Sequence, residues 1–363
     1  MPPPARSAAP TVAVVVLNWD GLPLTRCCIH SLLAQTWTAL EIHVVDNGSA
    51  NGEAQALRAE YGERIRVWAL PHNEGFAGGC NAALAAILAE GRCPFAALLN
   101  NDAEAEPRWV EELVAAAGQD PRIGAVASRM RLFAEPDLLD GAGVWLLSNG
   151  DATPRGRLQP ARDWEEGDDV LAACGGAVLL RSAMLREIGV FRPDFFANFE
   201  DTDLLLRAVV AGWRIRYAPR AEVRHHLNAT IARVRDLSFD VRSVRNATWA
   251  FFVNLPLPVL LLNLPGFLLS NLAIVLLMPL AGRPGVAVAF VRGRLRALGE
   301  LRALWRERAR LAPLRRAPWW RIWWMQRSFV LEYARLLALR LRGRRSGLMV
   351  RRAAPDAGRP PSG

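Results

Sequence analysis

The sequence contains no lysine, few cysteines and no internal repeat. All 45 of its basic residues are therefore arginine. Because arginine carries all of the basic charge, its abundance does not by itself indicate a nucleic-acid partner, and no recognition motif for nucleic acid is present. The five cysteines are odd in number and lack a Cys-x-x-Cys pair, which argues against a zinc site or a disulfide framework and is typical of a reducing cytosol.

Charged residues are absent from one long stretch of the chain. None occurs between Asn246 and Gly282, and 19 arginines but only 3 glutamates follow between Arg283 and Arg352. The rest of the chain carries a slight excess of acid, although the whole has a formal charge of +10. This distribution indicates an ordinary acidic globular part and a basic C-terminal part, and 363 residues suffice for one large or two ordinary domains.

Apolar runs and amphipathic stretches alternate along the first third of the chain. The first apolar run, Val12–Leu17, is continuous and rich in β-branched residues, which is typical of a strand buried on both faces. The predicted strands are Val12–Leu17, Glu41–Asp46, Ile65–Leu70, Phe95–Leu99 and Ile123–Ala127. Helical patterns with short connections separate them, so we predict an α/β fold with a doubly wound, mainly parallel sheet of the Rossmann-like kind.

Polar side chains follow directly after several of these strands. Asp20, Asp46, Asn73 and Asp102 each lie just past a predicted strand end. Ligands of such sheets bind outside the carboxyl ends of the strands, so we expect these side chains to share one binding edge.

Each of these motifs also has an ordinary explanation. The segment from Asp46 to Gly48 is a common turn, and Asn100-Asn101-Asp102 can cap a helix. The glycines from Gly75 to Gly79 could simply let a helix pack closely on the sheet, because they lack the spacing of the dinucleotide-binding and Walker patterns. The shared position at one sheet edge favours a binding site over the separate structural explanations.

A cluster of acids, Glu200, Asp201 and Asp203, follows a group of aromatic residues at the start of an apolar helical pattern. Acids in a first helical turn are favoured by the helix dipole, which one carboxylate would satisfy. An apolar rim raises the proton affinity of a carboxylate and makes it a usable general base. The aromatic surroundings therefore point to catalysis as well as to capping.

Three further segments complete the candidate site. Residues 131–169 have a loose pattern and predict a mobile loop that could close over a ligand. Gly175 and Gly176 interrupt an apolar run where a backbone can approach a substrate closely. His225 and His226 follow a predicted strand, Arg214–Tyr217, and beside several acids they can contact a metal or phosphate.

In this order the motifs resemble the inverting family-2 glycosyltransferases with the GT-A fold, particularly their bacterial rhamnosyltransferase-like branch. The resemblance covers about residues 11 to 230 and is carried by Val14–Gly21, Val44–Ser49, His72–Asn81, Leu98–Asp102, Cys174–Leu180, Phe195–Leu204 and His225. Three positions depart from the family pattern. Asn100 stands where many members have a second carboxylate, Asp20 replaces the usual asparagine, and Gly189–Arg192 replaces Gly-Gly-Phe-Asp.

The resemblance implies a role for each motif. The nucleotide-sugar would be held by Asn18, Trp19, Asp20, Asp46, Asn73, Gly75, Gly79, Asn81, Asn100 and Asn101. Asp102 and His225 would bind a divalent cation, Mg²⁺ or Mn²⁺, at the diphosphate. Asp201 would act as general base, with Glu200 and Asp203 orienting the base or the acceptor. The acceptor would contact Gly175, Gly176, Phe199 and Glu200.

The uncharged stretch predicts contact with a membrane. Residues Phe251–Leu280 are long enough to cross a bilayer, but several prolines break them and arginines flank both ends. Because the positive-inside rule disfavours one crossing with arginine on both sides, a re-entrant or in-plane arrangement fits better. The Trp- and Arg-rich segment Trp319–Tyr333 is typical of interfacial helices. A soluble helical subdomain or a dimer interface is the alternative.

These observations predict a GT-A catalytic domain followed by a helical, membrane-seeking region. The expected divisions are a disordered 1–10, a catalytic domain 11–245 with halves 11–127 and 128–245, a membrane-associating region 246–350 and a disordered 351–363. We expect an inverting glycosyltransferase at the cytoplasmic face of the inner membrane, peripheral or re-entrant, that moves a sugar such as rhamnose from a nucleoside-diphosphate donor to a lipid-linked or cell-envelope glycan. The oligomeric state, homo-oligomers included, stays open.

Two rival functions use the same sequence features. A nucleotidyltransferase could use the same sheet edge, but it would need a basic residue near the phosphates, and the glycine loop contains none. A catalytically silent, membrane-associated glycan-binding protein would keep the fold and lose turnover.

Overall fold

The computed structural model describes residues 9–226 and 235–341. The predicted disordered ends therefore lie outside the described residues, apart from Ala9 and Pro10. The strands are β1 (Val12–Asn18), β2 (Leu40–Asp46), β3 (Arg66–Ala69), β4 (Phe95–Asn100), β5 (Ala103–Ala105), β6 (Ile123–Leu132), β7 (Leu139–Gly141), β8 (Val144–Leu146), β9 (Ala152–Pro154), β10 (Asp169–Val170), β11 (Ala177–Arg181) and β12 (Arg214–His225).

Helices separate the strands of the first half and form most of the C-terminal part. They are α1 (Leu22–Leu33), α2 (Glu53–Tyr61), α3 (Gly75–Glu90), α4 (Trp109–Gly118), α5 (Ser182–Ile188), α6 (Glu200–Val210), α8 (Leu237–Asn254), α9 (Leu257–Leu280), α10 (Pro284–Gly299), α11 (Leu301–Leu311), α12 (Trp319–Met325) and α13 (Phe329–Leu341). Short 3₁₀ turns occur at Gly62–Arg64, Ala161–Asp163, Pro193–Phe195 and Ala312–Leu314.

One sheet organises the molecule. Its main path through the described residues runs β10-β12-β6-β11-β4-β1-β2-β3, with β5 beside β12 and β7 beside β6. Strands β1 to β4 pair in parallel, and β6 and β12 do so as well, whereas β11 is antiparallel to both of its neighbours. The predicted doubly wound, mainly parallel sheet is confirmed.

The alternating side chains of the strands bury the sheet on both faces. On β1, Ala13 and Val15 pack with α3, α5 and α6, whereas Val12, Val14 and Val16 pack with α1, α2 and α4. Burial on both faces explains the unbroken apolar run from which this strand was predicted. Two layers of helices thus fix the strand ends that carry the polar motifs.

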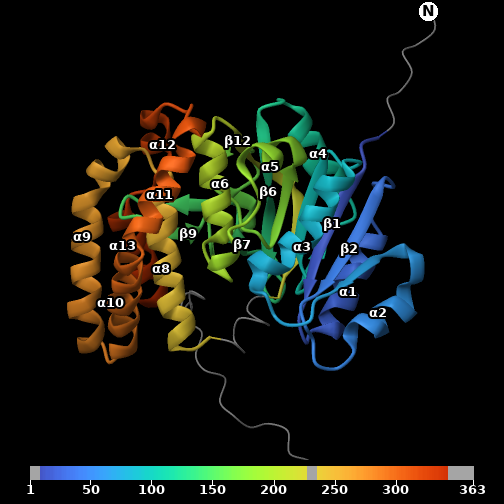
Figure 1. The fold of residues 1–363 in the computed structure, drawn as a ribbon, viewed down its shortest axis with the longest axis horizontal. Helices are drawn as coiled ribbons and strands as arrows, with labels where there is room; N and C mark the ends of the chain where they lie inside the picture. Colours follow the sequence, from blue (N-terminus) through green and yellow to red (C-terminus); the bar gives the residue numbers. More distant parts are fainter. Residues whose placement is uncertain (1–8, 227–234, 342–363) are drawn as a thin grey trace, which may run out of the picture.

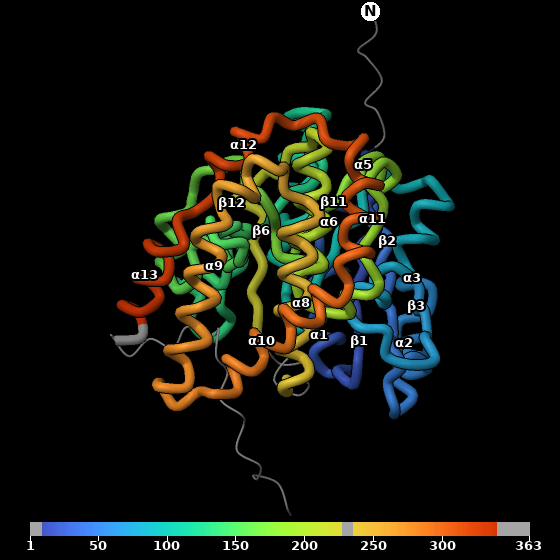
Figure 2. The backbone as a smooth tube through the Cα atoms, turned by 60° about the vertical axis from the view of Figure 1, so that its left-hand side comes forward, coloured from blue at the N-terminus to red at the C-terminus, as the bar shows by residue number. Residues whose placement is uncertain are grey.

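The C-terminal helices pack together on one side of the sheet domain (Figure 1). In Figure 2, α8 lies beside α6 and α11, and the three helices contact one another through α8. A small core that contains Phe195, Trp249, Val253 and Leu304 joins this group to the segment before α6. The predicted boundary at residue 245 falls inside α8, so the change from charged to uncharged sequence occurs within one continuous helix.

The segment 131–169, predicted as a loop, contains the end of β6 and the short strands β7, β8 and β9. The loop prediction is wrong in this respect. Strand β6 extends to Leu132 because Arg129 and Arg131 both pair with Glu222 of the neighbouring β12, at 3.1 and 2.9 Å. Charged residues that satisfy one another across strands can therefore continue a strand whose apolar pattern has ended.

Candidate active site

Asn18, at the end of β1, is the centre of a buried network at the predicted donor edge. Its amide donates to the carboxylates of Asp46, at 2.9 Å, and Glu53, at 2.8 Å, and its oxygen accepts from the Thr25 hydroxyl at 2.7 Å. Asn101 donates to the same hydroxyl at 3.0 Å. Asn18, Asp46 and Asn101 thus hold the ends of β1, β2 and β4 together.

Asp20 and Trp19 follow β1 at the rim of this network. The Asp20 carboxylate accepts the backbone N–H of Ala50 at 3.0 Å, and its own N–H donates to the Ser49 hydroxyl at 2.9 Å. Asp20 has a positive φ of 46°, a backbone conformation that aspartate tolerates better than most residues. Trp19 is half-buried beside it. The turns after β1 and β2 are therefore joined to each other.

The glycine loop at the start of α3 packs closely against other parts of the site. Asn73 accepts the N–H of Gly75 at 2.8 Å, and Gly75 has a positive φ of 71°. A Cβ atom on Gly75 would lie 2.4 Å from the carbonyl oxygen of Phe196, and one on Gly79 would lie 2.4 Å from Leu17. Packing thus requires a glycine at position 75, as the ordinary explanation of the motif states, whereas a side chain at position 79 would have to displace the end of the Leu17 side chain.

Asp201 lies in the first turn of α6 with its carboxylate directed at the second glycine pair. One carboxylate oxygen accepts the backbone N–H of Gly175 at 2.8 Å, and the other accepts the N–H of Thr202 at 2.6 Å. Burial raises the pKa of Asp201 above its usual range, although these hydrogen bonds act against the rise. A carboxylate with a raised pKa and a fixed orientation is suited to take a proton.

Glu200 lies beside Asp201 and is more deeply buried. Burial raises its pKa well above the usual range, and the neighbouring Asp201 adds to the effect. Within the described part of the chain, its Oε2 atom has no hydrogen-bond partner. Burial therefore favours the protonated form of Glu200 more strongly than that of Asp201, so Asp201 is the more readily ionised acid of the pair.

The two glycines after Cys174 connect Asp201 to the end of β4. A Cβ atom on Gly175 would lie 3.4 Å from Asp201 Cβ, and one on Gly176 would lie 2.9 Å from the Asn100 amide. The Asn100 amide is in turn 3.5 Å from His225 Nε2. The acid at the start of α6 and the Asn100 motif therefore lie at the same edge of the sheet.

His225, at the end of β12, bridges two buried carboxylates. Its Nε2 atom is 3.0 Å from Asp102 Oδ1, and its Nδ1 atom is 2.8 Å from Asp140 Oδ2. Burial lowers the pKa of His225, but the hydrogen bonds to Asp102 and Asp140 outweigh burial and raise the pKa to about 10. Arg157 donates to the other oxygen of Asp140 at 2.6 Å.

A divalent cation fits this group in part. A carboxylate behind the imidazole, as Asp140 is here, is the usual support of a histidine that ligates a metal. Asp102 and His225 would then be two ligands, and the Asn100 amide lies 3.5 Å from the Nε2 atom of His225. Among residues 9–226 and 235–341, however, no group of three or more His, Cys, Asp or Glu side chains is arranged to hold a metal.

Two of the residues predicted for the site lie away from this edge. Asp203 is fully buried and accepts from Arg207 at 3.1 Å and from the Asn254 amide at 2.8 Å. Asn81 exchanges hydrogen bonds with the backbone of Phe191, at 2.9 and 3.1 Å. Both side chains are occupied in joining helices to neighbouring segments.

Comparison with known proteins agrees with this geometry. Residues 11–189 match the family model described as glycosyl transferase family 2. The chain carries a glycosyl transferase family 2 domain. The matched region holds the donor-edge motifs and the two glycines but ends before Asp201, Asp203 and His225.

Several curated proteins are similar to this glycosyl transferase family 2 domain. An N-acetylglucosaminyl-diphospho-decaprenol L-rhamnosyltransferase of Mycobacterium tuberculosis is 27% identical, over 59% of this chain and 75% of the relative. An N-acetylglucosaminyltransferase of Rhizobium leguminosarum bv. viciae is 31% identical, over 58% of this chain and 50% of the relative. A further relative, the Sinorhizobium fredii protein y4gI, is 28% identical, and the match spans only 25% of its length.

Solved structures share the fold. The Pyrobaculum calidifontis mannosyltransferase PcManGT, in complex with GDP-Man and Mn²⁺, superposes with a TM-score of 0.50 at 18% identity and covers 85% of each chain. GalNAc-T7 with UDP, GalNAc and Mn²⁺ superposes with a TM-score of 0.55 at 15% identity, over 68% of this chain and 48% of that chain. The predicted GT-A fold is confirmed.

Three residues of the glycosyltransferase site carried no signal in the sequence. Asp140 lies in an unremarkable Asp-Gly dipeptide, Arg157 is one of many arginines, and Glu53 reads as an ordinary first-turn helix acid. Each becomes part of the site only because segments far apart in the sequence contact one another at His225 or Asn18. For the predicted residues, the structure gives positions and contacts, and their roles toward ligands stay predictions.

Proposed function

We propose that the chain is an inverting glycosyltransferase in which Asp201 is the general base. The acceptor hydroxyl oxygen attacks the anomeric carbon, the bond from that carbon to the diphosphate oxygen breaks, and the hydroxyl proton passes to Asp201. The observation that carries the proposal is the contact between Asp201 and Gly175, which connects the base through Gly176 and Asn100 to the Asp102–His225 pair.

The donor is a nucleoside-diphosphate-sugar held at the ends of β1, β2 and β4. Asn18, Asp46 and Asn101 support this edge, and the half-buried rim at Trp19, Asp20 and Asn73 would contact the nucleotide. Asp102 and His225 would hold a divalent cation, whose charge would stabilise the departing diphosphate. The named ligands of the two solved relatives, nucleotides with Mn²⁺, support this assignment.

The sugar and the acceptor are proposed on weaker support. The Mycobacterium tuberculosis relative is named for transfer of L-rhamnose to a lipid-linked glycan. We extend rhamnose and a lipid-linked acceptor to this chain because its C-terminal helices also suggest a membrane.

We further propose that α9 lies in the plane of a membrane at the cytoplasmic face. The helix has 24 residues and a mean hydropathy of 2.1, and most of it is exposed. Its polar residues face inward, where Asn263 donates to Gln326 at 3.0 Å and Asn271 accepts from Arg294 at 2.9 Å. A helix about 36 Å long that packs against its own protein through one face could not cross the bilayer without drawing Arg294 in with it.

Leucines cover the outer face of α9 and provide the membrane contact. The most exposed are Leu257, Leu261, Leu262, Leu268, Leu269, Leu272, Leu276, Leu277 and Leu280. Exposed tryptophans at Trp305, Trp319, Trp320 and Trp324 and the surrounding arginines suit an anionic interface.

Flotation with vesicles tests the membrane proposal. The chain should float with vesicles that contain anionic lipid, and the double variant Leu268→Glu with Leu272→Glu should remain in the soluble fraction. Leu33→Glu changes an exposed leucine on α1 and should float normally. Stable dimers that form without lipid and disappear in the double variant would instead assign this face to a second copy of the chain.

The glycosyl-transfer proposal is tested by ligand binding followed by turnover. UDP, dTDP, GDP and CDP are each compared by thermal shift with and without Mg²⁺ or Mn²⁺, and a ligand at a hundredfold excess over its Kd adds about 2.7 kcal/mol to the stability. The nucleotide-sugar of the stabilising base is then supplied with a polyprenyl-diphosphate glycan.

The products separate the rival functions. Release of the nucleoside diphosphate together with a glycosylated acceptor supports sugar transfer, whereas transfer of the nucleoside monophosphate with release of sugar 1-phosphate indicates a nucleotidyltransferase. Glycan binding without consumption of any donor would show a silent binding protein.

A further inference from the structure

The backbone directly before Asp201 is strained. Phe196, Asn198 and Phe199 have positive φ values of 61°, 71° and 68°. Residues with a Cβ atom adopt this region at a cost of roughly 1–3 kcal/mol each, and they keep it only where the surroundings impose it. Asp201 follows two residues after Phe199, so whatever holds this segment also sets the start of α6.

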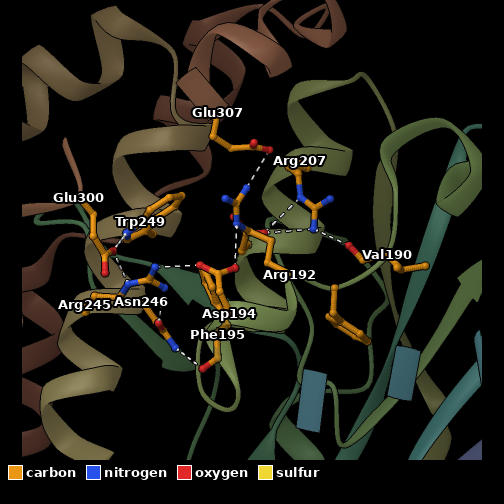
Figure 3. Close-up of polar contacts among 12 residues, drawn as sticks. Val190, Arg192, Asp194, Phe195, Arg207, Arg245, Asn246, Trp249, Glu300 and Glu307 are labelled. Atoms are coloured by element: carbon orange, nitrogen blue, oxygen red, sulfur yellow. Dashed lines mark hydrogen bonds and ion pairs between the residues drawn. The ribbon is translucent and has the colours of Figure 1, made fainter. Parts of the chain in front are cut away.

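Asn246 of α8 holds the strained segment through hydrogen bonds to the carbonyl groups of that segment. Its side-chain amide donates to the carbonyl oxygens of Phe195 at 2.8 Å and Asn198 at 2.9 Å, and more weakly to that of Ala197 at 3.3 Å. Figure 3 shows the Asn246 side chain reaching from α8 to Phe195. The residue is completely buried, so water cannot replace these bonds.

Arg245 fixes the orientation of the Asn246 amide. It donates to the Asn246 oxygen at 3.1 Å, to Asp194 at 2.8 Å and to Glu300 at 2.7 Å. Glu300 also accepts from the Trp249 indole at 2.6 Å. All of these contacts are drawn in Figure 3, and together they tie the segment before α6 to α8 and to the junction of α10 and α11.

The other side of the segment contacts the glycine loop of the donor edge. The Phe196 carbonyl accepts the N–H of Ala77 at 3.0 Å and occupies the space that a side chain at Gly75 would fill. The segment is thus held between α3 and the C-terminal helices, of which α8 supplies the bonds of Asn246.

We propose that Asn246 is a positioning residue for Asp201. It holds the left-handed segment Phe195–Phe199 in the conformation that directs the Asp201 carboxylate toward Gly175 and the acceptor. The proposal rests on the assigned role of Asp201 as general base. It makes the C-terminal helices part of the catalytic unit as well as a membrane contact.

The test compares the full-length wild type with Asn246→Ala and Asn246→Ser. Because a small misplacement of a base can cost about a hundredfold in rate, we expect kcat to fall roughly 10- to 100-fold in the alanine variant. Serine retains one donor and should lose less. The KM for the donor and the Kd of the stabilising nucleoside diphosphate should stay within about twofold, because the donor edge does not contact Asn246.

Thr248→Val is the matched control. Thr248 lies on the same helix and accepts a hydrogen bond from Arg294, on the side of α8 that faces α10. Removal of its hydroxyl costs a partly buried bond without touching the strained segment, so kcat should be unchanged.

The number of nucleotide-binding sites per protein molecule distinguishes a misplaced Asp201 from a loss of folded protein. If Asn246→Ala loses activity only in proportion to lost nucleotide-binding sites, so that kcat per site equals the wild-type value, the proposal is wrong. If the alanine variant does not fold, kcat per nucleotide-binding site is measured in the serine variant instead, and a value equal to that of the wild type contradicts the proposal. A wild type that transfers no sugar overturns the proposed function together with this inference, whereas an active wild type matched by its Asn246 variants overturns the inference alone.

Discussion

The two sides of the active site are held in different ways. On the donor side, Asn18 bonds directly to Asp46, and the Thr25 hydroxyl links Asn18 to Asn101. On the acid side, Asp201 follows a strained segment that depends on Asn246, 45 residues further along the chain from it. The donor side is thus stabilised within the sheet, whereas the acid side needs a helix outside the sheet.

This difference indicates that the donor side and the acid side have separate roles. A rigid strand edge suits recognition of a nucleotide, whose shape is the same in every cycle. The acid must face an acceptor, and its position can be adjusted through α8 and the helices behind it. Variants should therefore separate donor binding from turnover, and the four predictions below use that separation in order of expected size.

Asp201→Asn should have the largest effect. Loss of a general base costs about 10²- to 10⁴-fold, and the donor edge is untouched, so transfer should nearly stop while nucleotide binding remains. Asp163→Asn, on an exposed acid, is the control. In the wild type, activity should fall on the acid side at a pH above the usual aspartate range near about 4, because burial raises the pKa of Asp201. Undiminished transfer by the variant would show that Asp201 is not the base.

Gly75→Ala should destabilise both sides of the site at once. The left-handed backbone costs about 1–2 kcal/mol, and overpacking against Phe196 adds about 1–3 kcal/mol. Gly91→Ala is the matched comparison, because Gly91 also has a positive φ, of 69°, but its nearest neighbour is 3.7 Å away. Urea unfolding should show the larger loss at Gly75, and equal losses would contradict the close contact with Phe196.

Asp140→Asn should weaken the metal site about 10- to 100-fold, the range expected when the carboxylate behind a ligating histidine is lost. The measurement is the Mn²⁺ concentration that gives half of the nucleotide-dependent thermal shift. Asp137→Asn, at a fully exposed side chain nearby, should leave that concentration unchanged. An unaltered titration in Asp140→Asn would remove His225 from the proposed cation site.

Glu200→Gln should have the smallest effect and a characteristic pH dependence. Burial and Asp201 raise the pKa of Glu200 well above its unfolded value near about 4.3, so the folded protein holds a proton that the unfolded chain releases. The wild type should therefore lose stability relative to the variant as pH rises above about 5. Melting temperatures from pH 5 to 8 measure this, with exposed Glu63→Gln as control. A constant gap would contradict the raised pKa.

Much of the fold could be predicted because its signals are local. Strands β1, β2, β3 and β4 agree with their predicted positions to within about one residue. For β1 and β4 the reason is burial on both faces, which leaves an unbroken apolar run. The end of β6 could not be predicted, because Arg129 and Arg131 are acceptable in a strand only when Glu222 lies opposite them. The predicted strand Arg214–Tyr217 likewise extends to His225 through the same pairing.

The candidate site also contains residues that could be predicted from the sequence and residues that could not. Strand ends and glycine pairs pointed to Asp46, Asp102 and Gly175 because ligand sites of α/β sheets occur at strand ends. No rule of spacing could assign Asp203 to Arg207 and Asn254, since the direction of an acid in a first helical turn depends on what packs against each face.

The sequence by itself determined the class of the sheet, the edge at which its polar residues gather and the uncharged stretch that forms α9. These follow from hydrophobic periodicity and from where turns interrupt it, both of which act over a few residues. The tertiary structure alone decided that Asp140 bonds to His225, that Asp203 bonds to Arg207 and Asn254, and that Asn246 bonds to the segment before Asp201. Such contacts join segments far apart in the chain, and their energies depend on burial and mutual orientation that no local pattern contains.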